Sequence, residues 1–280
     1  WSGGVVPTSA DDVTISSTTS NIAVLIGTTA DFNTLTIGGS ASSTVTVTLT
    51  GSIGTGGNLT VSTNGTLIQN NALAQTISGA LVAEASSTLA HTANPGDATT
   101  QDYGFLFNVG SLDLQASSTL TAASRGFNRF NCDDSAFTSG VGPGSGFGST
   151  DAGSGASHGG LGGQARNSGP LAQDLVYGDV SAPTTYGSSG GNVHFSCAGS
   201  GGGAIKVSIA GGGTATVNGT INADGGNGIG VNDVHSGGGS GGSIWLDFTS
   251  GGTFAGSGII SAAGGRGSSG NAFGDAGGGG

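Results

Sequence analysis

The chain contains two cysteines, Cys132 and Cys197, which are its only candidates for a covalent cross-link. In an oxidising compartment an even number of cysteines indicates disulfide pairing. A bridge between them would close a loop of about 65 residues, and closing such a loop contributes up to roughly 4 kcal/mol of stability through chain entropy. Two separate buried thiols are the alternative. Because the sequence has no CxxC pair and no zinc-type spacing, we expect the disulfide.

Acidic and amide side chains surround the first cysteine in the sequence Asn131-Cys132-Asp133-Asp134. Carboxylate and amide oxygens in loops are the ligands that calcium prefers. Asp133 and Asp134 are therefore candidate calcium ligands. An exposed acidic turn without a metal is the simpler interpretation, and we expect no other cofactor.

Three asparagines, Asn58, Asn64 and Asn218, lie in Asn-X-Thr sequons. Such sequons accept N-linked glycans where the source glycosylates them. Ordinary strand and turn composition is the simpler explanation for each one. We retain the three asparagines as candidate glycosylation sites.

Catalytic motifs are missing from the sequence. The histidines His91, His158, His194 and His235 have no HxH or HExxH spacing, and we expect them in loops rather than as ligands. No GxSxG elbow occurs, and no glycine run ends in the Gly-Lys-Ser/Thr of a phosphate-binding loop. A glycan-cleaving β-helix would need clustered carboxylates beside a base, whereas the five basic residues are scattered. We therefore expect no enzyme activity.

Aromatic side chains offer a different chemistry, because exposed rings can stack on sugars. The candidates are Tyr103, Tyr177, Tyr186 and Trp245. If they are exposed together, the chain is a carbohydrate-binding adhesin module with surface glycans as partners. The alternation around Trp245 leaves the face on which its ring lies ambiguous.

Composition limits the partners. Sixteen acidic and five basic residues give a net charge of −11, and phosphate binding needs clustered Lys and Arg, so we expect no nucleic-acid partner. No run of eighteen apolar residues occurs, so we expect no membrane span. Charged residues are 8% of the chain, against about 25% in average soluble proteins. Together with the many Ser, Thr and Gly residues, this favours an extracellular or cell-surface location.

The chain has no methionine and begins at Trp1. We expect a processed protein or a segment of a longer one.

The elements that would position these residues are organised by an internal repeat. The stretch 202–228 aligns without a gap to 241–267, an offset of 39 residues. Each copy holds an alternating apolar run, a glycine turn and a second short strand, and such runs predict half-buried β-strands. The matched pairs are Ile205 with Ile244, Val207 with Leu246, Ile209 with Phe248, and Ile221 with Ile260. One such unit cannot bury its own apolar face, so the repeat predicts a solenoid in which the units stack.

A shorter module recurs upstream, beginning at Gly57, Gly79 and Gly110. It aligns one set of leucines, Leu59, Leu81 and Leu112, and a second set, Leu67, Leu89 and Leu120. The spacings of 22 and 31 residues suit coils of a β-helix with loops of different length. We expect each set to form one inward stack. Strands of a β-sandwich with similar local composition are the alternative.

Further strands are predicted at residues 13–15, 22–26, 32–37 and 45–49, and helical periodicity is absent. The clearest alternation is 44–50, where threonines occupy one face and Val45, Val47 and Leu49 the other. We expect a core face and an exposed threonine face. A water-ordering threonine array is the sharper alternative, although a single row does not make an array.

Glycine, 61 of 280 residues, dominates four runs: 140–163, 187–203, 225–242 and 264–280. Ordering a glycine costs more entropy than ordering any other residue, so ordered runs need hydrogen bonds from neighbouring segments. Extended polyproline-II chains have none internally, but glycine runs packed side by side can bond to each other. We predict a polyglycine-II-like layer; flexible linker is the alternative.

The segments WSGGVVPTSADDVTI, SHGGLGG followed by VYGDVSAPTTYGSSGG, GGGAIKV and GGGSGGSIWL resemble the glycine-rich β-helical proteins of large bacterial surface and secreted polypeptides. The resemblance implies an extracellular parallel β-helix in an adhesin, stalk or fibre, and it transfers no catalytic residue. We expect an all-β, right-handed parallel β-helix with a solenoid at 1–126, a glycine-rich insertion at 127–203 and the repeat region at 204–280. The expected function is structural, as a building block of a surface fibre, stalk or filament that associates head to tail or continues in a longer chain.

Overall fold

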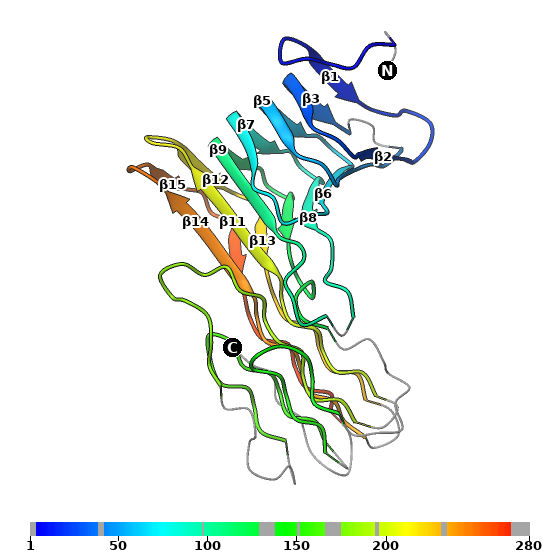
Figure 1. The fold of residues 1–280 in the computed structure, drawn as a ribbon, viewed down its shortest axis with the longest axis vertical. Helices are drawn as coiled ribbons and strands as arrows, with labels where there is room; N and C mark the ends of the chain where they lie inside the picture. Colours follow the sequence, from blue (N-terminus) through cyan, green and yellow to red (C-terminus); the bar gives the residue numbers. More distant parts are fainter. Residues whose placement is uncertain are drawn as a thin grey trace.

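The structure is a computed structural model that describes residues 4–38, 42–96, 98–128, 138–149, 152–165, 175–193, 196–230 and 234–269. Within these ranges the protein is all-β and contains no helix, as the sequence predicted. The strands form two sheets, and both sheets run along the stack. The glycine-rich segments extend from one side of it (Figure 1).

The strands are short and regular. They are β1 Asp12–Ile15, β2 Ile22–Ile26, β3 Ala30–Ile37, β4 Val45–Leu49, β5 Ile53–Val61, β6 Gly65–Gln69, β7 Gln75–Ala83, β8 Thr88–His91, β9 Phe105–Leu114, β10 Thr119–Thr121, β11 Ala204–Ile209, β12 Thr214–Val217, β13 Thr220–Asn222, β14 Ser243–Phe248, β15 Thr253–Ala255 and β16 Ile259–Ser261.

All pairs between these strands are parallel. The first sheet has the order β1-β3-β5-β7-β9-β11-β14, with β12 also pairing with β9 and β15 pairing with β12, and the second has the order β2-β4-β6-β8-β10-β13-β16. The chain therefore visits the two sheets in turn, and we call each such turn a coil. Parallel pairing of successive coils is the arrangement of a solenoid, and it favours that prediction over the β-sandwich.

Two columns of apolar side chains run through the stack, one per sheet. In the first column the register links Val13, Leu35, Leu59, Leu81, Leu112, Ala215 and Phe254. In the second it links Val24, Val47, Leu67, Leu89, Leu120, Ile221 and Ile260. The six leucines matched in the sequence are all buried, which confirms the predicted inward stacks.

The 39-residue repeat is also confirmed by strand register. Ile205 pairs with Ile244 and Ile221 with Ile260, and Thr214 pairs with Thr253 between them. Both copies therefore lie directly on top of one another as successive coils.

Side-chain alternation explains why these segments form strands. In β4 the side chains of Val45, Val47 and Leu49 are buried, whereas Thr46 and Thr48 are half-buried on the other face. Fully burying one such apolar side chain stabilises the fold by about 1.5–3 kcal/mol. The predicted core face of this strand is confirmed, whereas its threonine face is half-buried rather than exposed as predicted.

The turn between the two sheets repeats from coil to coil. Asn64, Ser86 and Ser117 each adopt a positive φ, of 59°, 61° and 66°. Their main chains are bonded in sequence, from Asn64 N to Ser86 O at 3.2 Å and from Ser86 N to Ser117 O at 3.1 Å. The residue in the left-handed conformation turns the chain from one sheet to the other. Asn adopts this conformation more readily than most residues, because its short polar side chain can form a local hydrogen bond.

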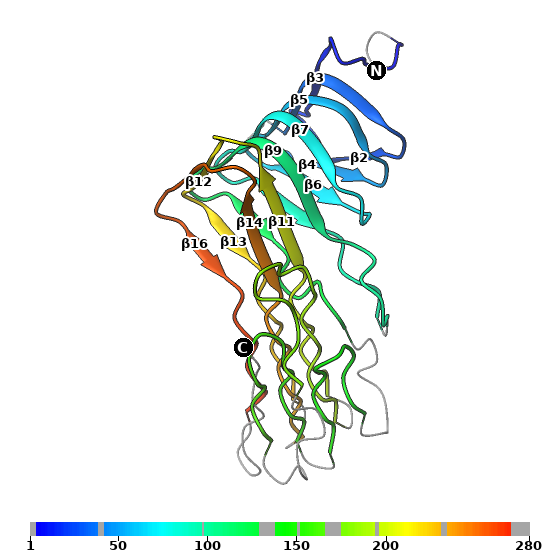
Figure 2. The same cartoon turned by 60° about the vertical axis from the view of Figure 1, so that its left-hand side comes forward.

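The glycine-rich segments lie side by side below the last coils (Figure 2). Their amides bond to carbonyls of neighbouring segments: Gly187 N to Gly202 O at 2.8 Å, Gly199 N to Gly237 O at 2.9 Å and Gly265 N to Gly239 O at 2.7 Å. The packing leaves no room for side chains, because a Cβ on Gly202 would lie 1.9 Å from Ala223 O. Glycine is therefore required here by close main-chain approach.

A small second core joins these segments to the coil stack. It consists of Phe127, Val141, Tyr186 and Ala204. The Tyr186 hydroxyl donates to Tyr103 O and accepts from Tyr103 N at 3.0 Å. The junction is therefore both apolar and hydrogen-bonded.

Candidate functional site

Among the residues that the structure describes, the strands at the C-terminal end of the coil stack have no second partner strand. Strands β14, β15 and β16 each pair with one neighbour, namely β11, β12 and β13. Phe254 and Ile260, which end the two apolar columns, are 54% and 45% exposed. Ile259 beside them is 64% exposed. We call this surface the C-terminal edge, and it combines open main-chain groups with apolar side chains.

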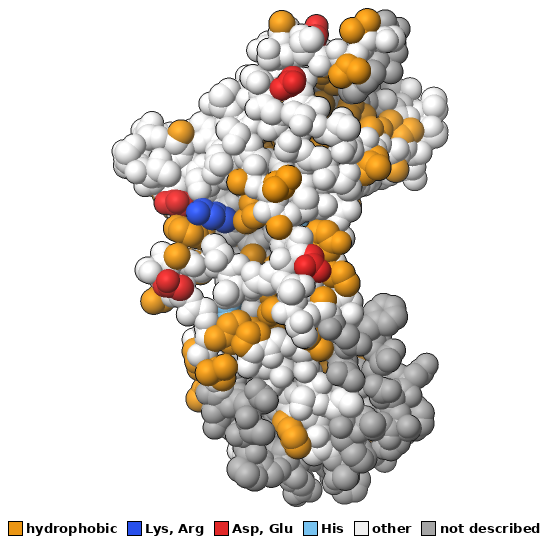
Figure 3. Space-filling model, viewed as in Figure 1, with side chains coloured by type: hydrophobic (Ala, Val, Ile, Leu, Met, Phe, Trp, Pro, Cys, Tyr) orange, Lys and Arg blue, Asp and Glu red, His pale blue; other side chains and the backbone are white. Residues whose placement is uncertain are grey.

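The N-terminal end of the stack holds two hollows, which Val6 and Pro7 of the segment before β1 also line. Strands β1 and β2 pair only with β3 and β4 among the described strands. Between them the core opens into a hollow of about 240 Å³ lined by Val13, Ile15, Val24, Phe32 and Leu35, among others. A wider hollow of about 660 Å³ adjoins it and shares Val13, Ile15 and Val24. Figure 3 shows hydrophobic side chains gathered at this end, at the top of the view. We call this surface the N-terminal hollow.

Asparagine and aspartate side chains link successive coils in one direction. The Oδ1 atom of Asn58 accepts from Ala80 N at 2.8 Å, and that of Asn218 accepts from Ser257 N at 3.2 Å. Asp224 and Asn227 likewise accept from Ala263 N and Arg266 N at 2.7 and 2.8 Å. In each case the acceptor is on the earlier coil and the donor on the later one.

The last coil lacks these acceptors. One repeat after Asn218, Asp224 and Asn227 the sequence has Ser257, Ala263 and Arg266, and none of these three is an Asn or Asp. A further coil added to the C-terminal edge would therefore form main-chain and apolar contacts without these amide and carboxylate bonds.

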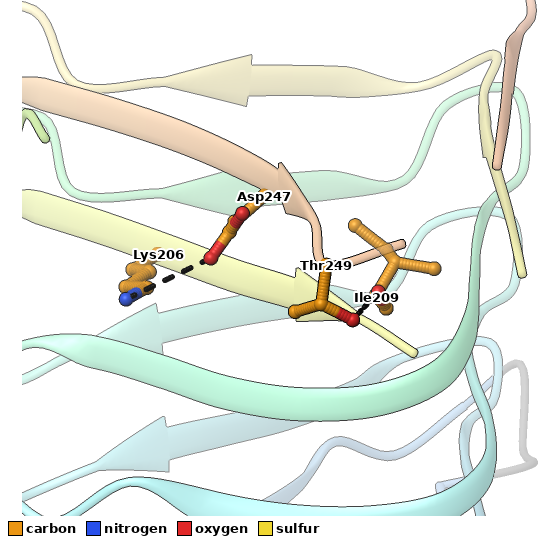
Figure 4. Close-up of polar contacts among 4 residues, drawn as sticks. All are labelled: Lys206, Ile209, Asp247 and Thr249. Atoms are coloured by element: carbon orange, nitrogen blue, oxygen red, sulfur yellow. Dashed lines mark hydrogen bonds and ion pairs between the residues drawn. The ribbon is translucent and has the colours of Figure 1, made fainter. Parts of the chain in front are cut away.

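The outward face of β11 and β14 carries the charged pair of this region. Lys206 Nζ lies 4.0 Å from an Asp247 carboxylate oxygen and 3.9 Å from the centre of the Trp245 ring. Figure 4 shows the ion pair bridging the two neighbouring strands, beside the bond from Thr249 to Ile209 O. Trp245 is thus placed on the outer, half-exposed face, with one side of its ring covered by the lysine.

The predicted sugar-stacking aromatics do not form one exposed platform. Tyr186 is fully buried in the second core, so the expectation that it is exposed is wrong. Tyr177 is half-buried, and its hydroxyl donates to Tyr186 O at 2.6 Å. Burial raises the pKa of both tyrosine hydroxyls. Tyr103 and Trp245 are also half-buried, so three of the four aromatic side chains are partly accessible.

The histidines are more buried than their sequence context indicated. His91 lies in β8 and is buried, so its expected loop position is wrong. Its ring stacks on Tyr186 with centroids 5.9 Å apart, and its Nε2 atom has no hydrogen-bond partner. Burial, together with a smaller effect of the nearby Arg125 cation, lowers the pKa of His91 to about 4, although the hydrogen bond to Thr92 O acts in the opposite direction.

Two other histidines lie among the glycine-rich segments. His158 Nε2 is 2.8 Å from Thr185 Oγ1, and burial lowers the pKa of its imidazole. His235 is buried with neither ring nitrogen hydrogen-bonded. The fourth histidine, His194, lies outside the described residues.

The remaining predicted sites are only partly described. Cys197 is disulfide-bonded, but Cys132, Asp133 and Asp134 lie outside the described residues, so the pairing and the calcium site stay predictions. Across the described ranges no group of three or more His, Cys, Asp or Glu side chains could hold a metal ion. Of the sequon asparagines, Asn58 and Asn218 are exposed and Asn64 is half-buried in its turn.

The exposure of Phe254 and Ile260 at the C-terminal edge was not predicted from the sequence. Phe254 aligns with Ala215 in the 39-residue repeat, so a large exposed aromatic side chain lies where the preceding coil has a small buried residue. Ile260 was matched to Ile221 correctly, but periodicity does not reveal which coil is the last.

No protein family matches the sequence, and neither the curated proteins nor the solved structures contain a match to it. In the part of the chain that is described, no helix is long and apolar enough to cross a membrane.

Proposed function

We propose that the chain is a structural, extracellular protein that serves as a building block of a surface fibre, stalk or filament. In this proposal the parallel coils wind as a right-handed β-helix, and the glycine-rich segments form a polyglycine-II-like layer attached to its last coils. The protein has no catalytic role and works by being long, rigid and extendable.

The observation that carries the proposal is that, among the described strands, both sheets end in edges without a second partner at both ends of the stack. The first sheet ends in β1 and β14, with β15 attached, and the second ends in β2 and β16. Open strand edges and open apolar columns favour addition of further strands. Soluble solenoids instead carry polar capping repeats, and the exposed Phe254, Ile259 and Ile260 are not such a cap.

Two routes extend the stack. One is head-to-tail association of separate copies, and the other is continuation into further coils of a longer chain. Both cover the same edges and both give an elongated object.

The proposed extracellular or cell-surface location is supported by the disulfide-bonded state of Cys197. Disulfides persist in oxidising compartments and are rare in the cytosol. The low charge content, 8% of residues, suits a surface that packs against other copies.

Carbohydrate binding is the second candidate function. A hollow of about 380 Å³ on the outer face is lined by Tyr103, Asn108 and Lys206, among others. Tyrosine rings and amide side chains are typical of sugar sites, and a glycan array would detect binding. Retention of a glycan by the native chain and its loss in Tyr103→Ala would favour this function over a purely structural one.

The structural proposal is tested by raising the concentration of the purified 280-residue chain and following it by sedimentation velocity and negative-stain microscopy. We expect elongated particles that lengthen with concentration. Compact monomers at every concentration would contradict the proposal.

A further inference from the structure

We infer that the partner of the C-terminal edge is the N-terminal hollow of a second copy of this chain, docked in one defined register. The inference rests on the proposed structural function and adds the identity of the partner and the residues that meet. In this register Val13 of the second copy continues the first column above Phe254, and Val24 continues the second column above Ile260.

The register follows from the two columns. Each coil contributes one residue to the first column, and this residue pairs with the first-column residue of the next coil. The column begins at Val13 and ends at Phe254. The second column does the same from Val24 to Ile260. A second copy that adds β1 to β15 and β2 to β16 at the same spacing extends both sheets and both columns together. A shift by one residue would turn every apolar side chain outward.

The two surfaces also fit in shape and polarity. The N-terminal hollow has apolar walls from Val13, Phe32 and Leu35, and Phe254 projects from the opposite end with 54% of its surface exposed. A side chain of this kind can enter the hollow and displace water from apolar walls, which favours association. Because the two surfaces are different, the contact is heterologous and propagates unless the rotation between copies closes a ring.

The missing acceptors on the last coil make this contact weaker than those within the chain. Asn218, Asp224 and Asn227 each accept a main-chain hydrogen bond from the following coil, whereas the equivalent positions one repeat later have no Asn or Asp side chain. The association is therefore reversible and depends on concentration, whereas coil-to-coil contacts inside the chain are permanent.

Cysteine cross-linking tests the register. Thr14 and Ala255 occupy the same outward column, which runs through Thr36, Thr60, Val82, Asp113 and Thr216. Docking would bring them to adjacent strands, about 4.8 Å apart, which is within disulfide range. A mixture of a Thr14→Cys chain and an Ala255→Cys chain should give a mixed disulfide dimer under mild oxidation.

A matched control replaces Thr14→Cys by Thr76→Cys, an exposed strand position in the middle of the same sheet. We expect at least tenfold less mixed dimer with this control. Equal yields for both mixtures would overturn the inferred register.

A second pair of variants separates docking from folding. Phe254→Asp removes the projecting ring and places a charge against the hollow, so we expect assembly to weaken at least tenfold in sedimentation. Leu161→Asp, at an exposed leucine among the glycine-rich segments, should assemble as the native chain does. Circular dichroism and tryptophan fluorescence establish that both variants are folded.

The outcomes distinguish this inference from the proposed function. Filaments that form without the Thr14–Ala255 cross-link, and that persist in Phe254→Asp, would overturn the docking mode and leave the structural function standing. A native chain that stays monomeric and forms no mixed dimer would overturn both.

Discussion

Leu81 lies in the middle of the first column, fully buried between Leu59 and Leu112 on the neighbouring coils. We predict that Leu81→Ala lowers the free energy of unfolding by about 2–5 kcal/mol, because it removes apolar contacts and leaves a cavity. Urea unfolding followed by circular dichroism measures the change. Leu73→Ala, at a side chain that is 55% exposed, is the control and should change the free energy by less than about 0.5 kcal/mol.

His91 is the buried residue whose protonation the fold opposes most clearly. Its unpaired Nε2 atom faces the crowded main chain at Gly203, where a Cβ would lie 2.1 Å from that nitrogen. The neighbouring charged group is Arg125, whose guanidinium donates to His91 O at 2.8 Å, and Tyr186 covers the ring. The buried Nε2 atom makes no hydrogen bond to any of these groups.

We therefore predict acid destabilisation. The pKa of His91 falls from 6.5 in the unfolded chain to about 4 in the fold, so the unfolded state binds the proton first as pH falls. Stability is full above about pH 6.5 and is lost progressively down to about pH 4, by up to about 3 kcal/mol. Urea unfolding at several pH values measures this loss. His91→Gln should flatten the pH dependence between pH 7 and pH 4.5, and an unchanged slope would contradict the assignment.

Residue roles could be predicted where they depend on local alternation. The leucine columns followed from spacing alone, because an inward position in a short strand is set by its neighbours in sequence. Tyr186 was placed wrongly because its partner, Tyr103, is 83 residues away. His91 was placed wrongly for a related reason, since its burial is completed by residues from the later segments near 186 and 203.

At the scale of elements, the glycine-rich segments depend on close approach between main chains. A Cβ on Gly237 would lie 1.9 Å from Ser154 O, whereas one on Gly159 would meet nothing within 4 Å. We predict that Gly237→Ala costs about 1–3 kcal/mol, because the added methyl group forces neighbouring segments apart. Gly159→Ala should be close to neutral.

Thermal unfolding and hydrogen exchange of the glycine-rich segments measure this difference. Amides such as Gly187 N and Gly199 N, which bond to carbonyls of neighbouring segments, should lose protection in Gly237→Ala and retain it in Gly159→Ala. Equal protection in both variants would show that the segments are not held by close packing.

Strands and repeats were predictable from the sequence, whereas the partners of the glycine-rich segments were not. Strands such as β2 and β4 have the bounds that their alternation indicated. Glycine carries no side chain, so its sequence position contains no information about which neighbour its amide will bond. Gly126 N, for example, bonds to Gly201 O, and only the folded arrangement of the coils brings these two residues together.

At the scale of the whole molecule, the coils differ in size along the stack. Successive first-column residues are 22 to 39 residues apart, except for one interval, from Leu112 to Ala215, which contains 103 residues. The N-terminal coils are therefore slim, and the glycine-rich segments widen the C-terminal coils on one side only (Figure 1). Phe254 and Ile260 stay exposed at the C-terminal column ends, whereas Val13 at the N-terminal end of the first column is buried beside the hollow.

Axial growth predicts one diffraction signature. Neighbouring coils are spaced by the separation of hydrogen-bonded strands, about 4.7–4.9 Å, along the stacking direction. X-ray diffraction from oriented filaments of the concentrated chain should therefore show a reflection near 4.8 Å on the meridian, parallel to the filament axis. Filaments with this reflection on the equator, or a concentrated chain that yields no filaments, would contradict the account.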